Sequence, residues 1–351
     1  MLVDRQIKSS NSKSLSQRVA VILAGALLCA QASAASAALS DEQQLLQQAE
    51  QFPAMRTLHI AHKDELILAT GLHGGNPDAP ANIKSASKLL MSAMVGVAIE
   101  QGLIESVHTP VSELLPNELP TKPDPRLQQL NVGHLLSMQA GLERTSGQNY
   151  GRWVNSANWV RYALSRPFVD EPGGEMLYSS GNTHMLSAII MDRSGHSTYR
   201  QFNDWFAGSG ARVSSWITDP QGIPMGGNQV SMTPASLLEF GEVYRRGGVT
   251  ETGERILPEE WIAASWQPRT QSIYTDDEHG YAWFLRELGG YQAYYGWGYG
   301  GQMLYVVPEL ELTVVITSDT SNPSGRSGYA RSLHRFVSDE IIPRIEAQQE
   351  S

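Results

Sequence analysis

The two ends of the chain carry short apolar runs with the composition of β-strands. Residues 55–62 (MRTLHIAH) and 65–71 (ELILATG) are separated by two polar residues, which predicts a hairpin. A second pair of such runs, residues 303–308 and 312–318, lies near the other end of the chain. We therefore expect an antiparallel sheet that both chain ends build together.

The middle of the chain follows a different pattern. Helical periodicity and loops dominate residues 86–245, and an amphipathic helix is predicted over residues 327–346. This order of elements predicts an α+β fold, an α/β sandwich in which helices flank an antiparallel sheet. Residues 39–105 and 240–351 would form the sheet-containing domain, and residues 106–239 an inserted, mostly helical region.

One predicted helix is apolar around most of its circumference. Residues 89–102 read LLMSAMVGVAIEQG, and a helix of this kind is buried. Lys88 in its first turn is anomalous, because burying an unpaired ammonium group is costly. Ser85 lies three residues earlier, on the same helix face. Burial and the helix N-terminus lower the pKa of a lysine, so a neutral Lys88 could be the base for a serine nucleophile. Alternatively, Ser85 caps the helix and Lys88 extends into solvent.

Two later segments could complete such a site. Tyr178 begins a Tyr-Ser-Ser sequence, where its phenol could relay a proton and the hydroxyl of Ser180 could add a hydrogen bond. Residues 297–302 (WGYGGQ) precede a predicted strand, and a backbone N–H there could serve an oxyanion hole. The alternatives are a packed tyrosine beside a helix cap and a β-bulge.

Together these motifs resemble the serine β-lactamase and penicillin-binding protein superfamily, in particular its class C-like and esterase-like branch. Ser-x-x-Lys, Tyr-x-Ser and a glycine-rich strand occur in that order. Residues 82–88 (NIKSASK) and 132–142 (VGHLLSMQAGL) are also similar to segments of the family. The resemblance covers roughly residues 50–345 and implies an active site between a sheet-containing domain and a mostly helical region.

The resemblance implies a role for each matching position. Ser85 would be the nucleophile, Lys88 its base, and Tyr178 the group that shuttles a proton to the leaving group. The backbone N–H groups of Ser85 and Gly301 would form the oxyanion hole, with Gln302 as the other candidate for the second donor. No cofactor is implied.

The third motif departs from the family pattern. β-Lactamases and transpeptidases carry Lys or His, then Ser or Thr, then Gly, whereas residues 298–300 read Gly-Tyr-Gly. Because the missing cation helps to hold the carboxylate of β-lactams, an uncharged ester or amide is expected to fit better, and Gly298→Lys would test this. Substrate contacts are expected from Ser180, Trp297, Tyr299 and Gln302. An aromatic cluster is expected to accommodate an apolar group of the substrate, and its members are Tyr294, Tyr295, Trp297, Tyr299 and Trp283.

The expected function is hydrolysis of an ester or amide through an acyl-enzyme on Ser85. A D-Ala-D-Ala peptidase or a weak β-lactamase is an alternative that the missing cation disfavours. A non-catalytic cell-wall-binding or peptide-binding relative is another, disfavoured because Ser85, Lys88 and Tyr178 are all present.

Composition narrows the range of partners. The chain has 351 residues, a net charge of −10 and no basic stripe, so nucleic acid is not an expected partner. His59 and His62 lie three residues apart in a strand pattern and face opposite sides, so no metal site is expected. The expected partner is a small-molecule ester or amide.

The first 38 residues have the features of a secretory signal. Basic residues precede a short apolar run over residues 19–28, and small residues suited to cleavage follow. We expect a cleaved signal and a periplasmic or secreted protein, with an uncleaved anchor as the alternative. Cys29 is the only cysteine and lies in this segment, so the mature chain would contain no disulfide. No later segment is long and apolar enough to suggest membrane insertion.

Overall fold

The computed structural model describes residues 41–325 and 327–349. The signal segment expected over residues 1–38 lies outside them. The chain divides into residues 1–48 and residues 49–351, and the fold and site belong to the second part. Residues 41–50 are helical.

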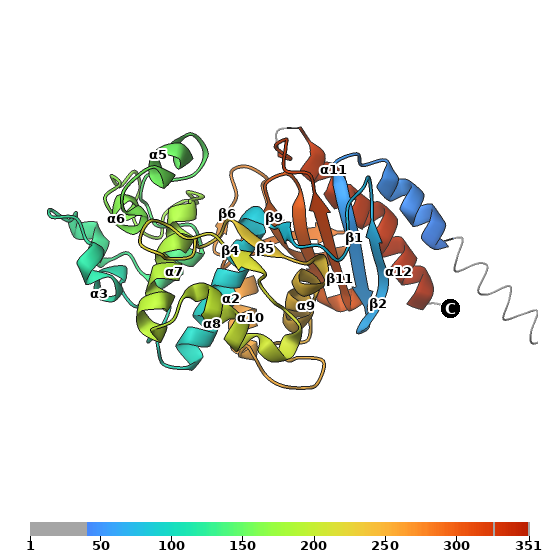
Figure 1. Ribbon diagram of the computed structural model, residues 1–351, viewed down its shortest axis with the longest axis horizontal. Helices are drawn as coiled ribbons and strands as arrows, with labels where there is room; N and C mark the ends of the chain where they lie inside the picture. Colours follow the sequence, from blue (N-terminus) through green and yellow to red (C-terminus); the bar gives the residue numbers. More distant parts are fainter. Residues whose placement is uncertain (1–40, 326, 350–351) are drawn as a thin grey trace, which may run out of the picture. The chain divides into compact units, whose positions relative to one another are not determined.

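An eight-stranded antiparallel sheet, in the order β2-β1-β11-β10-β9-β8-β7-β6, forms the centre of residues 49–351 (Figure 1). Both predicted hairpins are confirmed, and the pairing of β1 with β11 joins the two ends of the chain. The strands are β1 (Met55–His62), β2 (Glu65–Gly71), β6 (Thr270–Gln271), β7 (Glu278–His279), β8 (Phe284–Leu288), β9 (Tyr291–Gly298), β10 (Gln302–Val307) and β11 (Leu312–Ser318).

The turn between β1 and β2 shows how local sequence sets the register. Lys63 and Asp64 have φ angles of 51° and 67°, as a two-residue type I′ turn requires. The Asp64 carboxylate also accepts hydrogen bonds from Arg245 and Arg246. These ion pairs tie the end of the first hairpin to helix α9 (Pro234–Arg245).

Helices cover both faces of the sheet, which is why every residue of β10 and β11 is buried. On one face, α9 packs on β1, β10 and β11. The other face carries α11 (Tyr329–Phe336), a π-helical turn (Val337–Ile341) and α12 (Ile342–Gln349) (Figure 1). The Tyr305 hydroxyl of β10 lies 3.0 Å from Nδ1 of His334 in α11. The predicted C-terminal helix is thus confirmed, with a π turn inside it.

The remaining elements lie mainly between the first hairpin and β6. A small sheet joins β3 (Ala81–Asn82), β5 (Val230–Met232) and β4 (Ser215–Trp216). The helices are α2 (Lys88–Glu100), α3 (Val111–Leu114), α4 (Val132–Leu136), α5 (Tyr150–Val154), α6 (Trp159–Leu164), α7 (Ser180–Ser194), α8 (Thr198–Trp205) and α10 (Glu259–Trp266). The 3₁₀ turns are Lys84–Ser87 (η1), Pro116–Glu118, Pro125–Gln128, Gly147–Asn149, Ala207–Ser209 and Pro308–Leu310.

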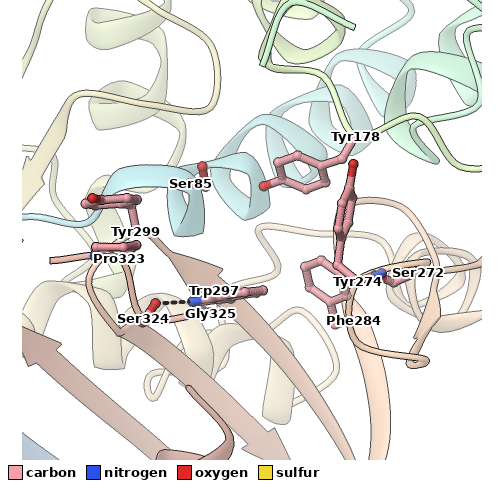
Figure 2. A pocket seen from close by; sticks show the side chains of 10 residues that line it. All are labelled: Ser85, Tyr178, Ser272, Tyr274, Phe284, Trp297, Tyr299, Pro323, Ser324 and Gly325. Carbon is pink, nitrogen blue, oxygen red and sulfur yellow. Dashed lines mark hydrogen bonds between the residues drawn. The ribbon is translucent and has the colours of Figure 1, made fainter. Parts of the chain in front are cut away.

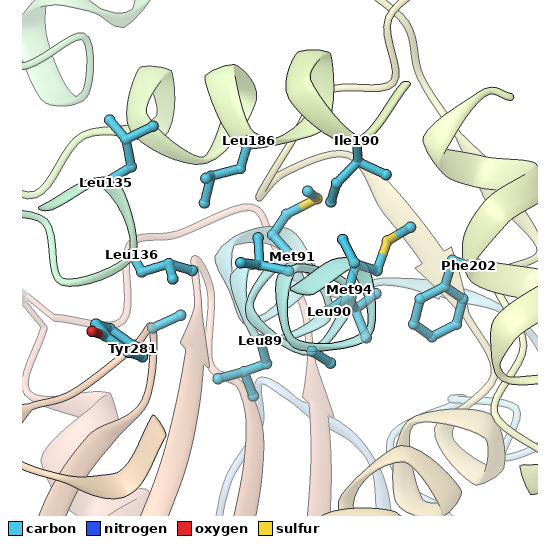
Figure 3. Packing of buried hydrophobic residues seen from close by; sticks show 14 of the residues in the cluster. Leu89, Leu90, Met91, Met94, Leu135, Leu136, Leu186, Ile190, Phe202 and Tyr281 are labelled. Atoms are coloured by element: carbon cyan, nitrogen blue, oxygen red, sulfur yellow. The ribbon is translucent and has the colours of Figure 1, made fainter. Parts of the chain in front are cut away.

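Helix α2 is buried on all sides, which confirms the prediction from its apolar sequence. Residues 88–98 are all buried. Figure 3 shows Leu186 and Ile190 of α7 and Phe202 of α8 around it. On the sheet side, Leu89 packs so closely on β9 that a Cβ at Gly296 would lie 2.3 Å from its Cδ1. Burial of each leucine or methionine stabilises the folded protein by about 1.5–3 kcal/mol. This packing fixes the position of the helix and therefore of its first turn. Among the described helices, none has the length and apolar character needed to cross a membrane.

Candidate active site

The candidate nucleophile lies in a tight turn at the start of α2. Ser85 belongs to η1, and the side-chain oxygen of Asn82 accepts the Lys84 N–H at 3.0 Å to begin that turn. The Ile83 carbonyl then accepts the Ala86 N–H at 3.1 Å. Lys84 has a φ of 51°, an unusual value for a residue other than glycine. The turn holds Ser85 partly exposed at the mouth of a cleft.

Lys88 extends inward from the next helical turn. Its side chain is buried, and Nζ lies 3.3 Å from Ser85 Oγ, 3.3 Å from Ser180 Oγ and 2.7 Å from the Gly227 carbonyl oxygen. No carboxylate forms an ion pair with it within residues 41–325 and 327–349. Burial therefore lowers the pKa of Lys88 to about 7. A large fraction of the amine is neutral near pH 7 and can accept a proton from Ser85.

The carbonyl that orients Lys88 was not found by sequence reasoning. Gly227 has a φ of 79°, and a Cβ there would lie 2.5 Å from Lys88 Cγ. Only glycine allows this loop to pass so close to the lysine. The signal in the sequence is the Gly226-Gly227 pair, but sequence alone does not place that pair beside residue 88.

Tyr178 approaches the same point from the segment before α7. The Leu177 N–H donates to the Met138 carbonyl at 2.8 Å, and Ser179 Oγ accepts the Thr145 N–H at 3.0 Å. The phenol points toward Ser85 (Figure 2), and Lys88 Nζ lies 5.0 Å from the ring centroid. Burial raises the pKa of Tyr178 to about 12, although a hydrogen bond with Ser85 opposes the shift. The phenol is therefore protonated at neutral pH.

Ser180 does not lie on the cleft wall, where a substrate contact was expected. Its hydroxyl is buried, accepts a hydrogen bond from Lys88 Nζ and lies 3.2 Å from Ser146 Oγ. The Ser180 N–H also donates to Ser146 Oγ at 2.8 Å. The reason is that residue 180 is the first residue of α7, whose side chain turns toward α2. Ser180 thus contacts the lysine, and Ser146 is a further neighbour that the sequence did not indicate.

A cleft of about 650 Å³ opens in front of Ser85 (Figure 2). Trp297 and Tyr299 line it, as the sequence placed them, and Trp297 is oriented by donating from Nε1 to Ser324 Oγ at 2.9 Å. Among the cleft-lining residues that the structure describes, none is acidic. The lining residues are Ser85, Tyr178, Ser272, Tyr274, Phe284, Trp297, Tyr299, Pro323, Ser324 and Gly325.

Three members of the expected aromatic cluster lie elsewhere. Trp283 is fully buried in the core, and Tyr295 is fully buried with its hydroxyl 2.6 Å from an Asp277 carboxylate oxygen. Tyr294 stacks on Trp266, with ring centroids 3.9 Å apart. Phe284 and Tyr274 occupy the cleft wall instead. Strands and loops distant in sequence build this wall, so proximity in the sequence was a poor guide.

The Gly301 N–H is already used within the turn after β9, and the Gln302 side chain makes no contact with the cleft. The Gly301 N–H already donates to the Gly298 carbonyl at 3.1 Å, and a Cβ at Gly301 would point into Tyr329. Gln302 is buried, and its amide exchanges two hydrogen bonds with the backbone of Ser318. It therefore joins β10 to β11 rather than contacting the cleft. The glycine pattern in the sequence did not reveal these hydrogen bonds.

Position 298 requires glycine for a steric reason that is independent of the charge expected there in the family motif. A Cβ at this position would lie 2.3 Å from the Ile83 carbonyl oxygen, on the turn that holds Ser85. Lysine cannot be accommodated there without moving that turn, so Gly298→Lys cannot test charge recognition. The close contact instead places the end of β9 directly beside Ser85.

We predict that Gly298→Ala displaces the Ile83 carbonyl and with it Ser85. Overpacking of this kind destabilises the native arrangement by about 1–3 kcal/mol. We therefore expect the rate at which a fluorophosphonate labels Ser85 to fall roughly tenfold or more. Gly151→Ala is the matched control, because no atom lies within 4 Å of a Cβ there. Equal labelling rates in the two variants would show that the close approach of β9 does not position Ser85.

The architecture is that of the β-lactamase fold, an antiparallel sheet flanked by helices. A serine and a buried lysine lie beside the end of strand β9. The family model for beta-lactamases matches residues 43–337, and the chain therefore belongs to the beta-lactamase family. No curated protein matches the chain.

Solved structures of similar fold include several hydrolases. A protein of Bacillus anthracis provisionally named 6-aminohexanoate-dimer hydrolase has a TM-score of 0.70 at 18% identity, covering 87% of this chain and 82% of its own. EstCE1, a hydrolase with promiscuous acyltransferase activity, has a TM-score of 0.68 at 18% identity, covering 86% and 99%. A class C β-lactamase of Rhodobacter sphaeroides has a TM-score of 0.63 at 15% identity, covering 88% and 99%. At such identities the likeness concerns the fold.

Proposed function

We propose that this protein hydrolyses ester or amide bonds through an acyl-enzyme formed on Ser85. The observation that carries the proposal is the buried, uncompensated Lys88, whose Nζ lies 3.3 Å from Ser85 Oγ. The neutral amine takes the proton of Ser85 as Oγ attacks the substrate carbonyl. The proton then passes through the Tyr178 hydroxyl to the departing oxygen or nitrogen. In the second half of the reaction, water attacks the acyl-enzyme ester. A proton from this water restores the hydroxyl group of Ser85.

The oxyanion of each tetrahedral intermediate requires two donors. The Ser85 N–H is the first, and we propose the Tyr299 N–H as the second in place of Gly301. Tyr299 follows the last residue of β9 and lines the cleft, and Gly298 brings the end of this strand against the Ile83 carbonyl. Two backbone N–H groups aimed at one point stabilise developing negative charge without reorganisation.

The cleft wall supports an apolar or aromatic group next to the reacting bond. Phe284, Trp297 and Tyr299 provide flat apolar surface, and β9 supplies no cation at the position where β-lactamases carry one. Removing a charge-assisted hydrogen bond costs about 1.5–3 kcal/mol, which disfavours β-lactams. The similar structures include a protein provisionally named 6-aminohexanoate-dimer hydrolase and a hydrolase with promiscuous acyltransferase activity, which is consistent with a hydrolase that forms an acyl-enzyme.

The test is a substrate panel combined with covalent labelling. We expect a fluorophosphonate to add one equivalent to the protein, and kcat/KM for p-nitrophenyl butyrate or hexanoate to exceed that for nitrocefin by at least about tenfold. The panel should also include anilides and short amide oligomers. Rapid nitrocefin hydrolysis would favour the β-lactamase alternative, and absence of both labelling and turnover would favour a non-catalytic relative.

A further inference from the structure

An arginine that the proposed mechanism does not use, Arg144, lies behind one wall of the cleft. Arg144 donates from Nη1 to the hydroxyl of Tyr274, and its guanidinium carbon lies 5.7 Å from the Tyr274 ring centroid. Tyr274 lines the same cleft as Ser85 and is 53% exposed at its mouth. One side chain therefore separates the guanidinium from the space that a substrate would occupy.

The position of Arg144 is fixed by the segment that holds Tyr178. Thr145 bonds to Ser179 through both its N–H and its hydroxyl, and the Thr145 hydroxyl accepts the Gly181 N–H at 2.8 Å. The side-chain amide of Asn149 donates to the Arg144 carbonyl at 3.1 Å. The backbone of Arg144 is thus anchored beside the proton-relay segment, while its side chain reaches across to the loop that carries Tyr274.

Among residues 41–325 and 327–349, no carboxylate compensates the charge of Arg144. Within the described part of the chain it forms no ion pair, whereas the preceding residue, Glu143, pairs with Arg166 at 3.3 Å. The described residues that line the cleft include no acidic side chain, although the protein carries a net charge of −10. A guanidinium offers five N–H donors in a planar fork that suits a carboxylate, and the Tyr274 hydroxyl, which accepts from Arg144, retains its own proton to donate.

We propose that Arg144, supported by Tyr274, binds a carboxylate carried by the substrate away from the reacting carbonyl. The proposal rests on the proposed ester or amide hydrolysis and identifies the substrates as monoanions with an apolar middle part. It revises the expectation of an uncharged substrate, because the cation missing from β9 is replaced by one on the Tyr178 side of the cleft. The carboxylate recognised there differs in position from that of a β-lactam.

Two pairs of substrates matched in length test the proposal and locate the carboxylate. Mono-p-nitrophenyl adipate and p-nitrophenyl hexanoate differ in a carboxylate on the acyl side, and 3-carboxyphenyl and phenyl hexanoate differ on the leaving-group side. For at least one pair we expect the unmodified enzyme to have the higher kcat/KM for the anion. Arg144→Gln should lower the anion-to-neutral ratio of that pair about tenfold, the effect of roughly 1.4 kcal/mol.

Arg152→Gln is the matched control, since Arg152 is an exposed arginine on the nearby helix α5. It should leave the ratio unchanged, whereas Tyr274→Phe should lower it less than Arg144→Gln does. The proposal is overturned if neither pair shows an anion preference, or if Arg144→Gln and Arg152→Gln have equal effects.

Failure of the proposed function would be seen separately. If no ester is hydrolysed, binding of both ester pairs to Ser85→Ala, measured by calorimetry, still tests Arg144. Tighter binding of the anion of either pair that is lost in Ser85→Ala combined with Arg144→Gln would support the anion site. Equal binding of anion and neutral ester in both pairs would overturn it.

Discussion

Ser85→Ala is expected to lower kcat by roughly 10³-fold or more and to abolish labelling by a fluorophosphonate. The reason is that the proposed reaction passes through an ester on Ser85 Oγ. Among the serine and threonine side chains that the structure describes, no other shares both its contact with Lys88 Nζ and its place on the cleft wall. Ser180 contacts the lysine but lies outside the cleft. Intact-mass analysis before and after labelling measures the adduct, and peptide mapping locates it.

Ser87→Ala provides a matched control two residues away. Its hydroxyl is buried and donates to the Lys84 carbonyl at 2.6 Å, so the substitution removes one hydrogen bond worth about 1 kcal/mol. We expect this variant to be slightly less stable but still labelled and active. An adduct mapped to Ser87 or Ser180 in the unmodified protein would refute the assignment of the nucleophile.

Lys88→Ala and Tyr178→Phe are each expected to reduce turnover by about 10² to 10⁴-fold while the fold remains intact. Because both belong to one proton network around Ser85, their effects should not add, and the double variant should be little worse than the poorer single variant. Circular dichroism of all three variants controls for misfolding. Losses that multiply in full would show that Lys88 and Tyr178 act independently.

The same lysine should set the pH dependence of the unmodified enzyme. Lys88 acts as a base only when neutral, and burial lowers its pKa to about 7. The labelling rate and kcat/KM should therefore rise with pH, be half-maximal near pH 7 and level off above it. Tyr178, with its pKa raised to about 12, remains protonated throughout this range and should not add a falling limb below pH 9. A rate that falls between pH 6 and pH 8 would exclude a neutral lysine as the base.

Much of the fold could be predicted because its signals are local. The strand pairs, the polar turn between β1 and β2 and the apolar helix α2 each depend on residues close together in the chain. The contact of Lys88 with Ser85 also followed from sequence, since a spacing of three residues joins two side chains on one helix face. The burial of this lysine was implied by the apolar residues that follow it.

The rest of the site was decided by contacts between distant segments. The Gly227 carbonyl on Lys88, the hydrogen bonds of the Gln302 side chain with Ser318, and the pairing of Arg144 with Tyr274 all join residues that only the packed fold brings together. The sequence showed that Gly298 departs from the family motif. The structure gives the reason for a glycine there, because a Cβ would lie only 2.3 Å from the Ile83 carbonyl oxygen. The sequence by itself determined the main elements and the contact of Lys88 with Ser85, because these depend on periodicity along one segment. The tertiary structure alone determined the cleft wall, the second oxyanion candidate and the place of Arg144 beside Tyr274, because these depend on how close separate segments can approach.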